Sequence, residues 1–188
     1  MEVTVAMPTI PTRIHSGMFK RALLSVTRQT FSASVSVAVD IQRVGAPKNR
    51  QRALEAVQTP WTAFLDDDDE FMPQHLERLL AHAQETGADY VYSWFEVIGG
   101  TDPFPMNFGK PFDPENPVET TITTLVRTEL AKEVGFLPTQ RFDGAQWWED
   151  RRFTLDCIEA GAKISHLPEK TWLWHHHSNN TMGRPDRW

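Results

Sequence analysis

Strand and helix patterns alternate through the first half of the chain, and this alternation constrains the fold more than any other feature. Short apolar runs typical of strands occur at residues 3–7, 35–39, 61–65 and 88–95. The segments between them place apolar residues at helical spacing, most clearly at Leu76, Leu79, Leu80 and Ala83. The pattern predicts an α/β domain with a mostly parallel central sheet and helices on both faces.

The second half of the chain is less regular. Residues 99–117 contain five prolines and predict a long loop, which in a compact domain is usually functional or mobile. A helix is expected over residues 149–160, followed by two short strands at 163–167 and 171–174. A length of 188 residues fits a single compact domain.

Composition excludes several classes of protein. No run approaches ~18 apolar residues, so we expect no membrane-spanning helix. The first residues lack the basic and apolar regions of a signal peptide. Cys157 is the single cysteine, so no internal disulfide can form, as is usual in a reducing cytoplasm. We therefore expect a soluble, cytoplasmic protein. A net charge of -6 makes nucleic acid an unlikely partner.

Familiar nucleotide and hydrolase motifs are also missing. The sequence has no GxxxxGK[ST] loop, no GxGxxG after the first strand, no GxSxG and no HExxH. P-loop phosphotransfer, dinucleotide redox chemistry and serine-hydrolase chemistry are therefore not leading hypotheses.

An acidic run, Asp66-Asp67-Asp68-Asp69-Glu70, directly follows the apolar strand at residues 61–65. Runs of like charge often form solvated turns, and that interpretation stays open. However, ligands in parallel sheets bind at the carboxyl ends of strands, where this run lies. Five crowded carboxylates repel one another, and a bound divalent cation would relieve the repulsion. Oxygen ligands suit Mg²⁺ or Mn²⁺, so we favour a metal–phosphate site.

A second acidic pair, Glu149-Asp150, follows Trp147-Trp148 and opens the predicted helix. Acids in a first helical turn are often present only because they favour the helix dipole. The alternative is a carboxylate base held beside aromatic platforms on which a sugar ring could stack. Packing into the core is an equally plausible role for either tryptophan.

Three consecutive histidines, His175 to His177, lie near the end of the chain. On an extended segment His175 and His177 point to one side and His176 to the other. Such histidines are either structural or exposed, or they bind a metal together with carboxylates.

Taken in order, these segments resemble the GT-A glycosyltransferases of family 2, particularly short bacterial and bacteriophage members. The matching segments are VTVAMPTIPTR, LLSVTRQTF, VSVAVD, GAPKNRQRAL, TPWTAFLDDDDEFMPQHLERLL, TTLVRTELAKEVGFLP and WWEDRRFTLDCIEAGAKISHLP. Two positions depart from the family pattern. Asp40-Ile41 stands where paired acids are frequent, and Lys48 where arginine is frequent.

The resemblance implies a Rossmann-like GT-A domain over residues 1–188. Residues 1–98 would bind a nucleotide sugar, and residues 99–188 would face the acceptor. The residues implied to bind the nucleotide sugar are Pro8, Thr9, Arg13, Asp40, Lys48, Asp66 and Asp67. Those implied to ligate the metal are Asp68 and His177.

On the acceptor side the resemblance implies that Asp150 is the general base and that Glu149 is its neighbour. Trp147 and Trp148 would lie beside the acceptor. The activity expected is a metal-dependent, inverting transfer from a nucleoside-diphosphate sugar, with a UDP-sugar favoured and Mn²⁺ or Mg²⁺ as the cofactor. The acceptor is not specified, and a glycan, a protein or a small molecule is possible.

Two other functions fit the same residues. Clustered acids could hold two ions in a metal-dependent phosphoesterase or nuclease. The domain could also bind a nucleotide sugar without catalysing transfer. If the chain is encoded by a bacteriophage, its expected location is the host cytoplasm.

Overall fold

A seven-stranded sheet organises the computed structural model, which describes residues 2–117, 121–136, 141–142, 145–146 and 149–177. The strand order is β2-β1-β3-β6-β5-β9-β4. The strands are β1 (Val3–Thr9), β2 (Ser34–Val39), β3 (Trp61–Phe64), β4 (Glu70–Phe71), β5 (Tyr90–Ile98), β6 (Thr124–Arg127) and β9 (Ile164–His175). Two short strands, β7 (Arg141–Phe142) and β8 (Ala145–Gln146), pair separately.

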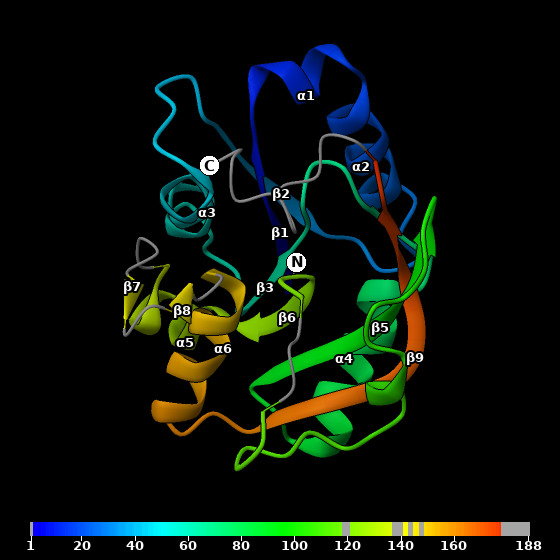
Figure 1. Ribbon diagram of the computed structural model, residues 1–188, viewed down its shortest axis with the longest axis vertical. Helices are drawn as coiled ribbons and strands as arrows, with labels where there is room; N and C mark the ends of the chain where they lie inside the picture. Colours follow the sequence, from blue (N-terminus) through cyan, green and yellow to red (C-terminus); the bar gives the residue numbers. More distant parts are fainter. Residues whose placement is uncertain (1, 118–120, 137–140, 143–144, 147–148, 178–188) are drawn as a thin grey trace.

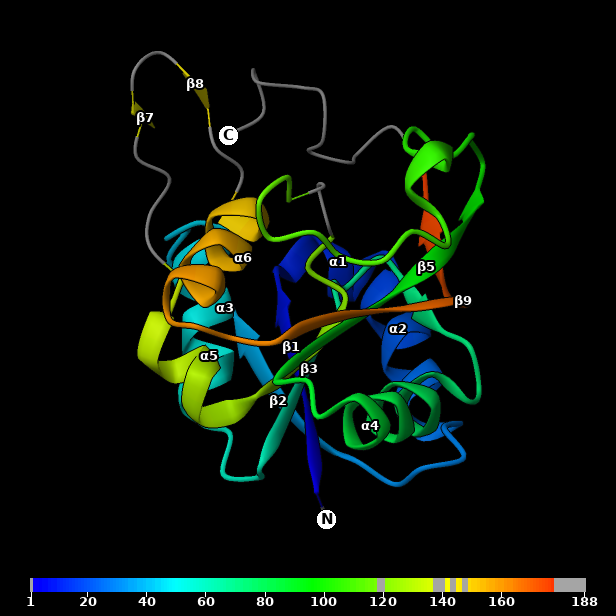
Figure 2. The ribbon, with the colours of Figure 1, turned by 90° about the horizontal axis from the view of Figure 1, so that it is seen from below.

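Helices cover both faces of this sheet, which confirms the predicted α/β class (Figures 1 and 2). One face carries α3, α5 and α6, and the opposite face carries α2 and α4. The helices are α1 (Pro11–His15), α2 (Met18–Thr27), α3 (Ala46–Glu55), α4 (His75–Thr86), α5 (Thr128–Val134), α6 (Glu149–Glu159) and the 3-10 helix η1 (Pro105–Asn107). Within the described part of the chain, every helix is too short or too polar to cross a membrane.

The sheet is mostly parallel, as predicted, because β2, β1, β3, β5 and β9 run in one direction, and two reversed strands, β6 and β4, make it mixed. Strand β1 is parallel to β2 and β3, and β5 is parallel to β9. Strand β6 is antiparallel to both β3 and β5, and β4 is antiparallel to β9. The pattern of the first half could not reveal this, because β6 and β9 come from the second half and pair with strands of the first.

Strand β9 is one long strand where two short strands were predicted. Ser93 of β5 pairs with Leu167, whereas the next residue, Trp94, pairs with Lys170. The shift in register absorbs Pro168 and its neighbour within a single strand, as β-bulges do. The strand therefore continues to His175 and brings the histidine segment to the acidic run.

Aromatic packing fixes α6 against the centre of the sheet. Phe153 of α6 stacks on Phe136 with ring centroids 4.5 Å apart, and Phe136 meets Phe64 of β3 edge-on at 5.3 Å. All three side chains are buried. The start of α6 and the end of β3, which carry the two acidic clusters, are thereby held in a fixed relation.

The segment 99–117 is the long loop that was predicted, and it packs onto β5 and β9. Trp94 Nε1 donates to Asp102 Oδ2 at 2.7 Å, and His166 Nδ1 lies 2.7 Å from the carbonyl oxygen of Lys110. Both contacts are partly buried, so they attach the loop to the sheet at two points.

Candidate functional site

The carboxyl ends of β1, β2 and β3 meet at one edge of the sheet, because these three strands are mutually parallel. A cavity of about 460 Å³ lies at this edge. It brings together nine of the residues that the sequence predicts for the site: Pro8, Thr9, Arg13, Asp40, Lys48, Asp66, Asp67, Asp68 and Glu149. The sheet thus gathers residues that are far apart in the sequence, from Pro8 to Glu149.

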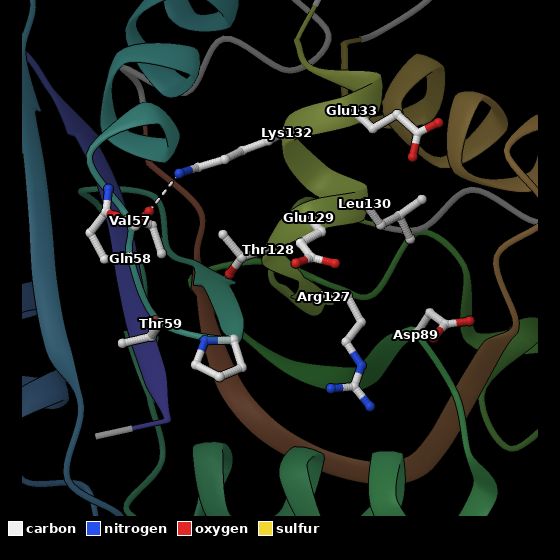
Figure 3. Close-up of a pocket in the computed structure, with 11 residues that line it drawn as sticks. Val57, Gln58, Thr59, Asp89, Arg127, Thr128, Glu129, Leu130, Lys132 and Glu133 are labelled. Atoms are coloured by element: carbon white, nitrogen blue, oxygen red, sulfur yellow. Dashed lines mark hydrogen bonds between the residues drawn. The ribbon is translucent and has the colours of Figure 1, made fainter.

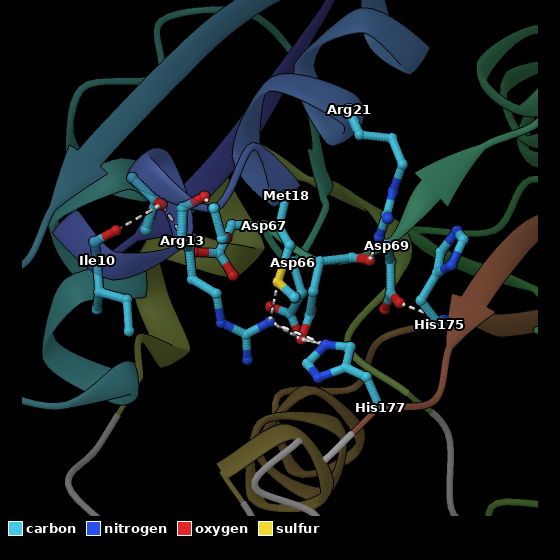
Figure 4. A network of polar contacts seen from close by, with 12 residues as sticks. Ile10, Arg13, Met18, Arg21, Asp66, Asp67, Asp69, His175 and His177 are labelled. Carbon is cyan, nitrogen blue, oxygen red and sulfur yellow. Dashed lines mark hydrogen bonds and ion pairs between the residues drawn. The ribbon is translucent and has the colours of Figure 1, made fainter. Parts of the chain in front are cut away.

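The acidic run folds so that its side chains point in two directions (Figure 4). Asp66, Asp68 and Asp69 each place a carboxylate oxygen within 4.8 Å of the others. Burial is the main cause that raises the pKa of Asp69 well above its usual range, and the charges of Asp68 and Asp66 add to the effect. Asp67 points to β1 instead and accepts a hydrogen bond from Thr9 Oγ1 at 2.7 Å. Burial raises the pKa of Asp67 to about 6.

Arg13 and His177 approach the acidic run from opposite ends of the chain (Figure 4). Arg13 Nη1 lies 2.5 Å from Asp68 Oδ2, and His177 Nε2 lies 3.2 Å from the same oxygen. Burial lowers the pKa of His177, although the charge of Asp68 opposes the shift. The neutral imidazole is therefore favoured, and it is the form that binds metals.

These groups fit a divalent cation. Carboxylates and a neutral imidazole are the donors that Mn²⁺ accepts, and the three clustered carboxylates are close enough to share one ion. A buried carboxylate with a strongly raised pKa, such as Asp69, also gains from a nearby positive charge. Asp68 and His177 are the residues that would hold such an ion, with Asp66 and Asp69 beside them.

The three histidines alternate in direction as the sequence predicted. His175 Nε2 lies 2.7 Å from Glu70 Oε1, and His177 faces Asp68. His176 turns away, donates its backbone N–H to Ile98 O at 2.8 Å and packs against Gly100.

Asp40 lies at the cavity, but its carboxylate is hydrogen-bonded to the loop that follows it. Its two oxygens accept the backbone N–H groups of Val44 and Gly45, both at 2.9 Å. Burial acts to raise the pKa of Asp40, but the backbone hydrogen bonds outweigh it and the pKa is lowered. The predicted contact of Asp40 with a nucleobase remains a prediction, as does that of Lys48, whose side chain is exposed at the cavity.

The two acids at the start of α6 differ in environment. Glu149 lines the cavity and accepts from Arg50 Nη1 at 2.9 Å. Asp150 does not line the cavity, and its carboxylate accepts the backbone N–H of Arg151 at 2.7 Å. Burial is the main cause that raises the pKa of Asp150 to about 7, and the charge of Glu149 adds to the effect. Trp147 and Trp148 lie outside the described residues.

Sequence reasoning named Arg13 but missed Arg50, a second cation that balances the acids. Arg50 is buried and bridges Asp66 at 2.6 Å and Glu149 at 2.9 Å, so it joins the two acidic clusters. Burial acts to lower the pKa of Arg50, but the two carboxylates outweigh it and raise the pKa. The signal available was charge balance, since a buried acidic run requires buried partners.

Asn49 is a second residue that sequence reasoning missed. It is buried, and its Nδ2 donates to Thr9 O at 3.1 Å and to Ala38 O at 2.9 Å. These two bonds tie the ends of β1 and β2 together beneath the cavity.

A larger cavity of about 690 Å³ lies at the other end of β3 (Figure 3). Lys132 Nζ donates to Val57 O there at 2.6 Å, and the Arg127 guanidinium stacks 4.2 Å from the Trp61 ring. None of the predicted site residues that the structure describes lines this cavity. Volume alone therefore does not identify the site, and the clustered charges do.

Comparison with known proteins relates the chain to one family. The sequence profile described as "Glycosyl transferase family 2" matches residues 11–135, which is more than half of the chain. A comparison of the sequence with curated proteins finds no significant match.

Solved structures of TarS from S. aureus share the fold. Residues 1–349 of TarS in complex with UDP match with a TM-score of 0.77 and 20% identity, over 94% of this chain and 61% of that one. The complex of the same residues with UDP-GlcNAc gives 0.78 and 20%, over 96% and 60%. A structure of TarS without stated residue limits gives 0.76 and 20%, over 94% and 37%. This chain thus spans about three fifths or less of the TarS chains.

Proposed function

The chain belongs to glycosyl transferase family 2, and on that basis we propose that it transfers a sugar from a nucleoside diphosphate to an acceptor hydroxyl, with inversion and with a divalent metal. The observation that carries this proposal is the convergence of Thr9, Asp40, Asp66 to Asp68 and Glu149 on one cavity. We assign residues 1–98 to the donor side and residues 99–188 to the acceptor side.

UDP-sugars are the first donors to test. The TarS structures that share this fold hold UDP and UDP-GlcNAc, which supports a uridine donor in a similar position. We propose that Pro8 and Thr9 line the base and ribose, with Asp40 and Lys48 beside them. Arg13 lines the same cavity and pairs with Asp68, and we propose that it also lies near the bound nucleotide sugar.

The metal is proposed to lie between the acidic run and the diphosphate. When bound, a divalent cation neutralises the charge that develops on the leaving diphosphate. Asp68 and His177 would hold the metal, and Asp66 would contact the ribose or a water on the metal. Arg50 keeps Asp66 in place through its 2.6 Å contact.

Asp150 is the proposed general base. It takes the proton of the acceptor hydroxyl while that oxygen bonds to the anomeric carbon and the bond to the diphosphate breaks. A pKa of about 7 suits this role, because a base works best when its pKa is near the working pH. Glu149 is less suited, since Arg50 already holds its carboxylate.

A thermal-shift screen tests the proposal. The protein is heated with UDP-, GDP-, TDP- and CDP-sugars, each with and without Mn²⁺, and turnover is then followed as release of the free nucleotide. We expect a UDP-sugar to stabilise the protein only in the presence of Mn²⁺. A phosphoesterase would instead hydrolyse simple phosphate esters, and a binding domain would be stabilised without any turnover on candidate acceptors.

The rate of transfer is expected to fall in acid. Asp150 acts as a base only when deprotonated, and its pKa is raised to about 7. At saturating donor and Mn²⁺ the rate should fall about tenfold for each pH unit below 7 and level off above it. Affinity for Mn²⁺ is measured over the same range as a control. Asp67 of the acidic run has its pKa raised to about 6, so it also gains a proton as the pH falls. A rate independent of pH between 5 and 8 contradicts the assignment.

Replacement of single histidines tests the metal ligands. The His177→Ala variant should bind Mn²⁺ more weakly by at least the ~10–100-fold that is typical of residues behind a metal ligand, because its Nε2 lies 3.2 Å from Asp68 and is a proposed ligand itself. The His176→Ala variant should bind Mn²⁺ normally, since His176 faces Gly100 instead. Calorimetric titration with Mn²⁺ measures both, and equal losses would show that the segment is only a surface tract.

A further inference from the structure

A chain of hydrogen bonds and ion pairs crosses the acidic run and joins α2 to β9. Arg21 Nε lies 3.0 Å from Glu70 Oε1, and His175 Nε2 lies 2.7 Å from the same oxygen. Glu70 therefore holds a side chain from each neighbouring element. The function proposed above gives none of these three residues a role.

Two backbone contacts strengthen this connection. Asp69 Oδ1 accepts the backbone N–H of His175 at 2.9 Å, and Arg21 Nη2 donates to the carbonyl oxygen of Asp68 at 2.7 Å. Figure 4 shows Arg21 and His175 approaching the acidic run from α2 and from β9. The run is thus fixed on one side by a helix and on the other by the last residue of a strand.

The position of His177 depends on this strand end, because only one residue separates it from His175. On the other side of the segment, His176 N donates to Ile98 O at 2.8 Å. A Cβ atom on Gly99 would lie 2.8 Å from His176 O, so the histidine segment runs directly against the backbone there. Held from both sides, the segment delivers His177 Nε2 to within 3.2 Å of Asp68 Oδ2.

We infer that Arg21, Glu70 and His175 are positioning residues that hold His177 in place as a ligand of the metal at Asp68. The inference rests on the proposed function, because it assumes that a metal binds there. Groups behind metal ligands orient them, and their loss typically weakens metal binding by ~10–100-fold.

Two variants that change the local charge in opposite directions distinguish a positioning role from a purely electrostatic effect on Mn²⁺ binding. Arg21→Met removes a positive charge near the acidic run, so electrostatics alone predicts tighter binding of Mn²⁺. Glu70→Gln removes a negative charge, so electrostatics alone predicts weaker binding. Positioning predicts weaker binding in both variants, by about 10–100-fold.

The control is Glu169→Gln. Glu169 lies on β9 and forms an exposed ion pair with Arg78 of α4, so it is a matched link between a helix and the same strand. It takes no part in the contacts around Asp68, and this variant should bind Mn²⁺ as the wild type does.

Pulsed electron paramagnetic resonance of bound Mn²⁺ supplies the decisive measurement, because it detects coupling to a ligating histidine nitrogen. We expect this coupling in the wild-type protein and in Glu169→Gln, its absence in His177→Ala, and its loss or marked reduction in Arg21→Met and Glu70→Gln. Full coupling with unchanged or tighter Mn²⁺ binding in Arg21→Met overturns the positioning role alone. If the wild type shows no nitrogen coupling, the proposed metal ligands are wrong and the inference falls with them.

Discussion

The Asp150→Asn variant is expected to bind the donor nucleotide with near-normal affinity but to transfer sugar ~10²–10⁴-fold more slowly, the range that a positioned base contributes. Asparagine keeps the size of the side chain and can still accept the backbone N–H of Arg151. It cannot take a proton from the acceptor. Donor affinity should survive because the proposed contacts with the nucleobase, the phosphates and the metal come from residues other than Asp150.

Calorimetry with the nucleotide and a nucleotide-release assay on the same protein separate the two effects. Glu149→Gln is the informative companion, because it removes the negative charge of the neighbouring acid, which is one of the two carboxylates that pair with Arg50. If Glu149→Gln abolishes transfer and Asp150→Asn does not, the base is Glu149. If neither variant slows transfer, the inverting mechanism loses its main support.

The Asp68→Ala variant is expected to lose the Mn²⁺-dependent part of nucleotide binding while the fold remains intact. A diphosphate beside Asp66, Asp67 and Asp69 is repelled unless a cation lies between them. We expect at least ~100-fold weaker binding in Mn²⁺, beyond the ~10–100-fold typical of residues behind a metal ligand. Removal of the Asp68 carboxylate lessens the repulsion felt by Asp69 but also removes the ion pair with Arg13.

Titration of the nucleotide with and without Mn²⁺ measures this directly. Asp113→Ala is a matched control, because Asp113 is an exposed aspartate in the loop 99–117 whose hydrogen bonds are with Glu115 and Asn116. The control should bind as the wild type does. Unchanged nucleotide affinity of Asp68→Ala in Mn²⁺ would remove Asp68 from the site.

Much of the donor side could be predicted from the sequence because it depends on local rules. The apolar spacing of Leu76, Leu79 and Leu80 predicts a buried helix face, and all three side chains are buried. A polar residue directly after a strand lies at the strand's carboxyl end. Since the carboxyl ends of parallel strands share one edge, the sequence predicts that Asp40 and Asp66, which follow the strands at 35–39 and 61–65, lie close together, and they line one cavity.

The tertiary structure alone decided how these charges are paired and where the second half of the chain lies. Arg50 pairs with Asp66, 16 positions away, and with Glu149, 99 positions away. No local sequence pattern encodes contacts over such separations. The insertion of β6 between β3 and β5, and the bulge that makes β9 continuous, likewise depend on long-range strand pairing. The alternation of the histidines was local and predictable, whereas the approach of His177 to Asp68 required long-range strand pairing, because β9 lies between β5 and β4 and its end meets the acidic run just before β4.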